Sequence, residues 1–472
     1  MARIAPFLYC CWFEITQGSD NYAVKGLQPS YSPQFQSGKT AHFYIVFVLL
    51  LLSLAAAPVS AESLTDAQQM ALQVNNALRA ESHRVQAARA ELQAVQANRL
   101  PTITNSTSYY TFSHPMSAGI GIAGAPPLIP PSTLDLPLTD QSFATSAAFA
   151  AVPLYTGGKI RAGIEANRYQ VRAAQAGYGV SQQEIRRQVT EAYLNVLRAR
   201  QMLNVAQEAE MALRQHLADA EKLFKQKMAT RNVLLAAQTA LASATQDVLK
   251  VGNAAALAEA AYNRLLGRPL DTPAVLDEVS VPPLSGELTA LTEEAFRCRK
   301  ELSRIRAVSQ AASAQGRASH ADKLPQVTAA GGYTYTQNSH LNEETAWVGA
   351  VSLKWTLFDG GAAQGRERAA KENAAAAARQ RDEVQSLIDL QVRSAWLTEQ
   401  ETRKRIQAAE IGLQQAAENL RVVTRQFQEG LVNHTEVLDA QTQRTAAETN
   451  RCNAVYDAVL ATYQVLYAAG KL

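Results

Sequence analysis

The stretch WVGAVSLKWTLFDGG (347–361) decides the fold, because a strand pattern ends there and a helix pattern begins. One face of the strand carries the large apolar residues Trp347, Val351, Leu353 and Trp355. Lys354 lies on the opposite face, since successive strand residues alternate. An apolar stripe with tryptophan at both ends and lysine behind it predicts a strand over about 346–358 between lipid and water. A half-buried sheet of a water-soluble protein shows the same alternation, and the pattern alone leaves that alternative open.

The preceding strand is predicted at about 326–336, where residues alternate in the same way. Aromatic rings with a polar end favour the boundary between lipid and water. The hairpin therefore has four expected membrane-interface aromatics, which are Tyr333, Tyr335, Trp347 and Trp355.

The chain contains one unit twice. LYTGG (154–158) matches LFDGG (357–361), and the same offset maps Phe224 on Phe427. Matches at a fixed offset indicate a duplicated structural unit. The predicted division is a first repeat at 62–267 with strands at about 102–113 and 141–155, a Pro-rich linker at 268–290, and a second repeat at 291–472.

The first repeat has an additional Gly/Pro-rich stretch, His114–Leu138. We expect an exposed outer loop there, because prolines cannot donate to a strand ladder. Gly119-x-Gly121-x-x-Gly124 matches a dinucleotide fingerprint by letter, but prolines follow where that motif needs a helix. The stretch is therefore not expected to bind a cofactor.

Residues 1–61 are predicted to be an N-terminal extension and signal peptide. Phe43–Ala57 is a 15-residue apolar run, short for a membrane span, and small residues follow it up to Ala61. The alternative is an N-terminal membrane anchor. The whole chain has a net charge of only +3, which gives no electrostatic reason to expect nucleic-acid binding.

Each long segment after the Gly-Gly pair predicts a very long helix. In the first repeat an apolar heptad runs from Val189 to Phe224 with one exception, Glu210, which favours coiled-coil packing. In the second repeat the helix Gly361–Phe427 would be roughly 100 Å long. Shorter helices are expected at Thr292–Ser319 and Thr435–Leu466, so the helices form an antiparallel strut.

Four strands cannot close a barrel in lipid, where the smallest single-chain barrels have about eight. Open sheet edges are not tolerated there. The membrane interpretation therefore requires several copies of the chain to pool their strands.

These features together resemble the TolC-like outer-membrane efflux protein family. The resemblance rests on the duplicated unit, Leu-Pro before the first strand of each hairpin, aromatic-x-Gly-Gly after the second, and GL…VLDAQ (430–441) at the last helical turn. It implies a mainly α fold with a membrane β portion, in which a homotrimer forms a 12-stranded β-barrel continued by a 12-helix α-barrel. It also implies a location in the outer membrane extending into the periplasm, contact with outer-membrane lipid, and partnership with a periplasmic adaptor and an inner-membrane pump.

The resemblance also assigns roles to individual residues. Gly430, Leu431, Lys227 and Met228 lie at the helical turns expected to contact the adaptor. The family usually has glycine where this chain has Lys227. Glu436 and Asp439 match positions at which the family carries acids at the periplasmic entrance. Asn433-x-x-Glu436 also resembles a helix-capping box, so capping is a second expected role.

No catalytic, cofactor or metal site is expected. Nucleophile motifs are missing from the sequence, and no histidine pair has the i, i+4 spacing of helical metal ligands. We therefore predict a passive exit duct for small molecules in a tripartite efflux system. The alternatives are the outer channel of a type I protein-secretion system and a trimeric coiled-coil surface protein without a pore. Cys298 and Cys452 are expected to be free thiols, because they lie far apart along the predicted helices.

Overall fold

The computed structural model describes residues 61–122, 132–284 and 286–472. Only Ala61 of the predicted extension and signal peptide falls within these ranges, so that prediction lies outside the described residues. Gly124 of the letter match is outside them as well. None of the helices in the described ranges is both long and apolar enough to cross a membrane.

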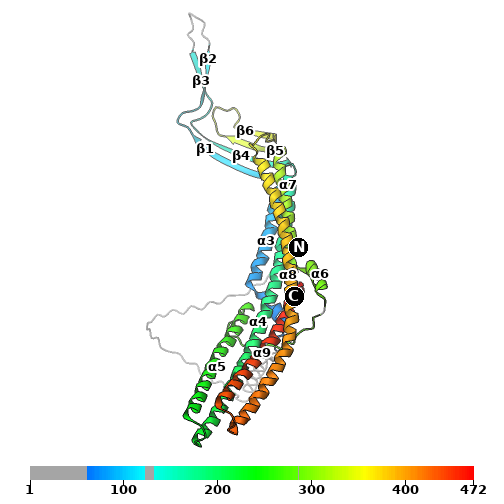
Figure 1. The fold of residues 1–472 in the computed structure, drawn as a ribbon. Helices are drawn as coiled ribbons and strands as arrows, with labels where there is room; N and C mark the ends of the chain where they lie inside the picture. Colours follow the sequence, from blue (N-terminus) through cyan, green and yellow to red (C-terminus); the bar gives the residue numbers. More distant parts are fainter. Residues whose placement is uncertain (1–60, 123–131, 285) are drawn as a thin grey trace, which may run out of the picture. The chain divides into compact units, whose positions relative to one another are not determined.

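The elements alternate between short helices, strands and long helices (Figure 1). The first half contains α2 (Leu64–Val74), α3 (Asn76–Ala97), β1 (Thr102–Thr111), β2 (Ser117–Ile122), β3 (Ser132–Pro137), β4 (Ser142–Tyr155), α4 (Lys159–Lys225) and α5 (Arg231–Leu265). The second half contains α6 (Leu288–Cys298), α7 (Lys300–His320), the 3-10 helix η1 (Ala321–Lys323), β5 (Gln326–Thr336), β6 (Thr345–Lys354), α8 (Ala362–Gln428) and α9 (His434–Ala468). The chain is mainly helical, and its β portion is small.

The strands β1 and β4 of the first half join β5 and β6 of the second half in one antiparallel sheet with the order β1-β4-β5-β6 (Figure 1). Thr102 pairs with Ala151 in the first hairpin, and Tyr333 pairs with Trp347 in the second. The two hairpins meet where β4 pairs with β5. The outer strands β1 and β6 have no further strand partner among the described residues.

The long helices α4 and α8 contain 67 residues each, so each is roughly 100 Å long. The helices α5 and α9 contain 35 residues each. α4 packs against α3, α5, α7 and α9, whereas α8 packs against α6, α7 and α9. Many buried positions on α5 and α9 are alanine, which allows the helix axes to lie close together.

A pair of buried tyrosines on α4 and α5 contacts the segments before α2 and before α6. Tyr193 on α4 and Tyr262 on α5 are fully buried, with their rings edge to face and 6.0 Å apart. The Tyr193 hydroxyl lies 2.8 Å from the carbonyl oxygen of Glu62 and 2.7 Å from that of Asp277. Burial raises the pKa of Tyr193 to about 12, so the hydroxyl stays protonated and donates to these carbonyls.

The opening helix of the second repeat, predicted as the single helix Thr292–Ser319, is broken at Arg299. The backbone of Arg299 is extended (ψ 120°), and α6 and α7 lie on either side of it. The first repeat has the same break at Asn75 (ψ 122°). There the Asn75 side chain accepts a hydrogen bond from the Ala77 amide at 2.9 Å and so begins a new helix.

The prediction that prolines exclude strand pairing from His114–Leu138 is wrong. Within this stretch β2 and β3 form a two-stranded antiparallel ribbon. The ribbon forms because the proline pairs at 126–127 and 130–131 lie beyond the last paired residues, outside the described ranges. Pro137 occupies the first rung, opposite Ser117, at the end of the ladder.

Two strands end earlier than predicted. β1 ends at Thr111 rather than 113, and β6 ends at Lys354 rather than 358. Trp355 has therefore left the ladder, and its indole nitrogen donates to the Lys323 carbonyl at 3.2 Å. The chain then turns into α8 through Gly360 and Gly361, whose φ values of 68° and 88° favour glycine.

Candidate functional site

The α4–α5 turn and the α8–α9 turn share one backbone geometry. A residue in the left-handed conformation follows each long helix, with φ 66° at Lys227 and 72° at Gly430. At both turns, the amide of the next residue donates at 2.8 Å to the carbonyl five residues earlier. This is the Schellman ending, which satisfies carbonyls that a helix end otherwise leaves free.

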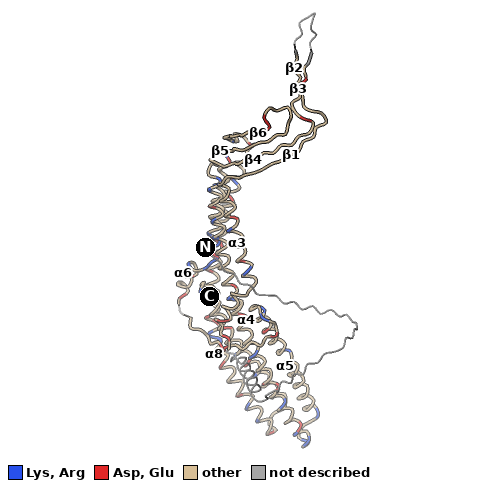
Figure 2. Tube along the Cα trace, turned by 180° about the vertical axis from the view of Figure 1, so that it is seen from behind, with Lys and Arg blue, Asp and Glu red and all other residues tan. Residues whose placement is uncertain are grey.

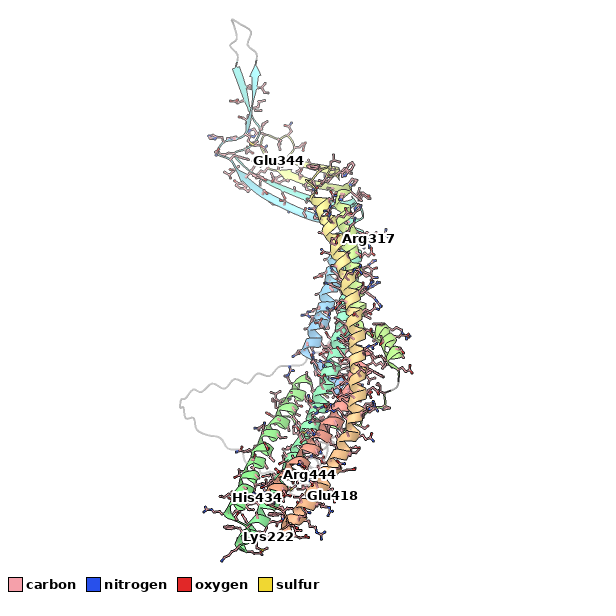
Figure 3. The ribbon with its side chains drawn as sticks, in the orientation of Figure 1. Lys222, Arg317, Glu344, Glu418, His434 and Arg444 are labelled. Carbon is pink, nitrogen blue, oxygen red and sulfur yellow. The ribbon has the colours of Figure 1, made fainter. Side chains whose placement is uncertain are left out.

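The four residues predicted to contact an adaptor lie in pairs at these turns. Lys227 and Met228 follow the first long helix, and Gly430 and Leu431 follow the second. Met228 and Leu431 are large apolar side chains, and both are 70% exposed. Figure 3 shows Lys222 near the end of α4 and His434 at the beginning of α9, at the same end of the helices.

The two predicted entrance acids lie on the free face of α9. Glu436 and Asp439 are exposed, whereas Val437 and Ala440, one residue after each, are buried. The helix is capped by Asn433, whose side-chain oxygen accepts from the Thr435 amide at 2.9 Å and the Glu436 amide at 3.2 Å. Capping by Asn433 is therefore confirmed, but no hydrogen bond from the Glu436 carboxylate back to the Asn433 amide is present among the described residues, so the second half of the predicted capping box is not formed.

Behind the turns, a buried histidine joins α4 to α8. The His216 ring lies 5.3 Å from the Phe427 ring, and only 8% of the histidine is exposed. Its Nε2 atom has no hydrogen-bond partner among the described residues. Burial lowers the pKa of His216, and nearby His434 lowers it further. The ends of α4 and α8 are thus joined by an aromatic contact in which the histidine favours its neutral form.

The predicted interface aromatics are all exposed in the single chain. Trp347 is 82% exposed and its ring lies 5.2 Å from that of its strand partner Tyr333. Tyr335 lies on the same face, two residues further along β5. Trp355 is 57% exposed but lies beyond the end of β6. Three of the four therefore belong to the sheet, and the fourth belongs to the segment leading into α8.

Sequence reasoning missed an ionic cluster at the beginning of α8. Glu367 accepts from Lys323 at 2.5 Å and lies 2.8 Å from Lys371 and 3.2 Å from His320. The Lys323 ammonium and then Lys371 lower the pKa of Glu367 to about 2. The residues come from η1, α7 and α8, so only the spacing between Glu367 and Lys371 could have been found in the sequence.

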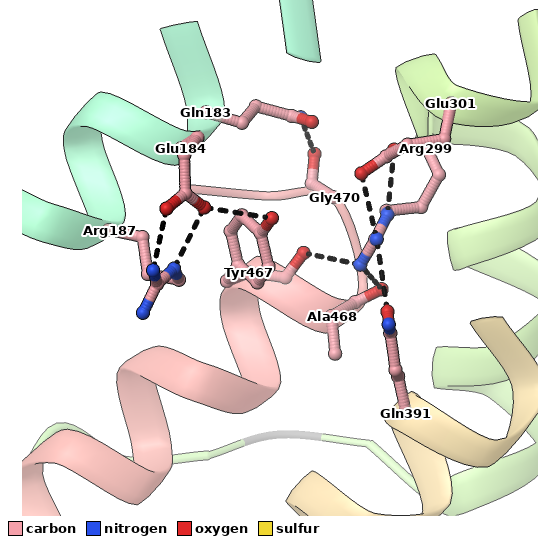
Figure 4. Close-up of polar contacts among 9 residues, drawn as sticks. All are labelled: Gln183, Glu184, Arg187, Arg299, Glu301, Gln391, Tyr467, Ala468 and Gly470. Carbon is pink, nitrogen blue, oxygen red and sulfur yellow. Dashed lines mark hydrogen bonds and ion pairs between the residues drawn. The ribbon is translucent and has the colours of Figure 1, made fainter. Parts of the chain in front are cut away.

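Sequence reasoning also missed the buried Arg299. Its guanidinium donates to the carbonyls of Tyr467 and Ala468, pairs with Glu301 at 2.8 Å and donates to Gln391 at 3.1 Å (Figure 4). These contacts join α7, α8 and the C-terminal end of α9. Nothing in the local sequence distinguishes Arg299 from the exposed Arg297 two residues earlier.

Across residues 61–122, 132–284 and 286–472, no group of three His, Cys, Asp or Glu residues is arranged to hold a metal ion. Cys298 is exposed, Cys452 is buried, and both thiols are free.

The sequence matches the family described as outer membrane efflux protein over residues 67–268 and 291–471. It is 24% identical to the outer membrane protein TolC of Vibrio cholerae over 312 residues, which span 64% of this chain and 71% of that protein. The fold is similar to the outer-membrane channel OprN, with a TM-score of 0.73 and 20% identity over 87% of this chain and 90% of that one. It is also similar to the Campylobacter jejuni CmeC outer membrane channel, with a TM-score of 0.71 and 15% identity over 97% of this chain and 94% of that one.

The fold is therefore the one shared by these outer-membrane channels. The chain belongs to the outer membrane efflux protein family, whose match covers most of its length. It is located in the outer membrane with an extension into the periplasm, and it serves as an exit duct for efflux.

Proposed function

We propose that three copies of the chain form this duct, with a 12-stranded β-barrel in the outer membrane and a 12-helix α-barrel in the periplasm. The unpaired edges of the four-stranded sheet carry this proposal. β1 and β6 have no outer partner within the described residues, and every residue of β6 is exposed. In lipid such edges must pair, and β1 of one copy with β6 of the next would pair all of them.

The helices support the same arrangement. α5 and α8 are the outermost long helices of the chain, on either side of α4 and α9. Both carry exposed leucines, including Leu249 and Leu257 on α5 and Leu390 and Leu397 on α8, each more than half exposed. Packing α5 against α8 of the next copy would remove this apolar surface from water.

The duct works passively, without a catalytic step or a cofactor, within a tripartite system. An inner-membrane pump supplies the energy, and a periplasmic adaptor docks on the turns that contain Lys227–Met228 and Gly430–Leu431. The exposed apolar side chains at both turns support this docking role, since a docked partner would remove them from water. The exported solutes are small molecules.

The entrance is lined by two rings of acids. Glu436 and Asp439 are three residues apart on one exposed face of α9, so threefold symmetry gives two stacked rings. Rings of carboxylates in a narrow aperture attract cations and repel anions. The entrance is therefore cation-selective.

The assembly is tested by native mass spectrometry of the purified full-length protein in detergent. We expect a trimer as the main species. A stable monomer would contradict the pairing of edge strands between copies and with it the barrel.

A further inference from the structure

The two turns at the tip carry opposite charge. Residues 219–239 around the first turn contain four basic and two acidic side chains, whereas the equivalent residues 422–442 contain one basic and three acidic ones. The basic residues of the first turn are Lys222, Lys225, Lys227 and Arg231. In Figure 2, which colours the Cα trace by residue type, Lys and Arg positions appear in blue at the turn between α4 and α5. The two equivalent turns of the duplicated unit therefore differ in net charge.

The positive charge of the first turn is not neutralised within the chain. Lys222 pairs with Asp219 at 3.2 Å, but Lys225, Lys227 and Arg231 are exposed and make no ion pair with any described residue. The second turn differs, because Arg425 pairs with its own neighbour Glu429 at 3.1 Å. Three cations of the first turn are therefore available to a partner.

The backbone of Lys227 gives an independent indication. Lys227 is the one non-glycine residue with positive φ in the described ranges, and the second repeat has Gly430 at the equivalent position. A side chain in this conformation is strained, and strain retained at an exposed turn points to a role for that side chain. Met228 beside it is 70% exposed and Phe224 is 39% exposed, so cations surround an apolar centre. That arrangement is typical of a protein-binding surface.

We propose that the α4–α5 turn binds an acidic loop of a partner protein, with carboxylates opposite Lys225, Lys227 and Arg231 and apolar side chains against Met228. The inference rests on the proposed function, in which the partner is the periplasmic adaptor. The α8–α9 turn, with excess acid, does not bind the same loop. In a trimer the α4–α5 and α8–α9 turns would alternate around the end of the helices. Sites that favour an acidic loop would therefore alternate with sites that disfavour it.

The test uses full-length protein in detergent and two fluorescent helical-hairpin peptides that differ only in the loop, three Glu in one and three Gln in the other. We expect the Glu peptide to bind more tightly, with an advantage that decreases at high salt. The variant Lys225→Gln/Lys227→Asn/Arg231→Gln should weaken binding of the Glu peptide roughly tenfold, the sum of three exposed ion pairs. Asparagine tolerates the left-handed backbone, so this turn keeps its shape.

The matched control is Arg421→Gln/Arg425→Gln, which removes two cations from the second long helix and should leave the affinity unchanged. Equal affinity for both peptides, or an equal loss in the control, would overturn the proposal. The triple variant could also change the conductance of the channel while its affinity for the Glu peptide stays unchanged. That result would overturn the proposal too, because the three cations would then pair with acids of a neighbouring copy. Native mass spectrometry of the same samples separates the two proposals. A trimer that does not prefer the Glu peptide refutes only this inference, whereas a monomer refutes the assembly.

Discussion

The guanidinium of Arg299 donates to the carbonyl of Ala468 at 3.3 Å, so the break between α6 and α7 holds the C-terminal end of α9. The Arg299 side chain is only 4% exposed, and its charge is balanced by Glu301. This contact joins residues 169 positions apart in the sequence.

Replacing Arg299 is expected to destabilise the fold. Arg299→Ala leaves Glu301 without its partner and the end of α9 without its donors, which costs about 3 kcal/mol. Thermal unfolding in detergent, followed by circular dichroism, should show a lower Tm. The control is Arg297→Ala, since Arg297 is 74% exposed and its pair with Glu293 is worth little. An equal loss in both variants would show that Arg299 has no special role.

The strain at Lys227 predicts a stabilising substitution. Lys227→Gly removes a side chain from a left-handed position and should raise the free energy of unfolding by about 1 kcal/mol. The reverse change, Gly430→Ala, should lower it by a similar amount, since nothing crowds a Cβ there and only the backbone conformation is unfavourable. Unfolding curves of the two variants against the wild type measure both effects. A destabilised Lys227→Gly would mean that the lysine side chain makes a stabilising contact.

His216 predicts a specific dependence of stability on pH. Its pKa is lowered in the folded state by burial and by His434, with Asp219 acting in the opposite direction. The unfolded chain therefore binds the proton more readily. The contribution of His216 to the free energy of unfolding is fully present above about pH 6.5 and is lost as the pH falls below it. In His216→Gln this part of the acid loss should disappear, whereas the exposed His83→Gln should behave as wild type. Parallel stability profiles of wild type and His216→Gln below pH 6.5 would refute the assignment.

The entrance acids predict a change in ion selectivity. Glu436→Gln with Asp439→Asn should reduce cation selectivity and abolish block by multivalent cations from the periplasmic side. Glu418→Gln removes an exposed acid that is paired with Arg421 further along α8 and should change neither property. Reversal potentials in a salt gradient measure the effect. If the double variant keeps wild-type selectivity and block, the two acids do not act on ions in the channel, and any role they have is confined to the beginning of α9.

The two cysteines should differ in reactivity. A maleimide should label exposed Cys298 in the folded protein and leave Cys452 unlabelled, because burial both shields that thiol and raises its pKa. Both should react after denaturation without reductant. Mass spectrometry counts the labels, and a denatured chain that takes up none would indicate a disulfide.

Regular, periodic parts of this fold could be predicted from the sequence. The strand predicted at 326–336 is β5, and the long helix predicted at Gly361–Phe427 is Ala362–Gln428. Both were predictable because the hydrophobic pattern repeats over many residues, so a single exception does not hide it. The breaks at Asn75 and Arg299 could not be predicted. At Arg299 the extended backbone accompanies contacts with residues far along the chain, which no local pattern contains.

The candidate site was predictable to a similar degree. The turns and the acids of α9 were found through the family resemblance, and the structure places them at the helix ends with the acids exposed. The strained backbone of Lys227 and the ion pair that occupies Arg425 were not visible, because both depend on side-chain and backbone geometry rather than residue type. The charge difference between the two turns was present in the sequence, but its meaning depends on which of the cations remain unpaired.

The most direct test of a passive duct is the conductance of the purified full-length trimer in planar lipid bilayers. We expect discrete, stable channels that conduct without any energy source and prefer cations. A trimer that inserts into the bilayer without conducting ions would contradict it, and would instead indicate a coiled-coil surface protein without a pore.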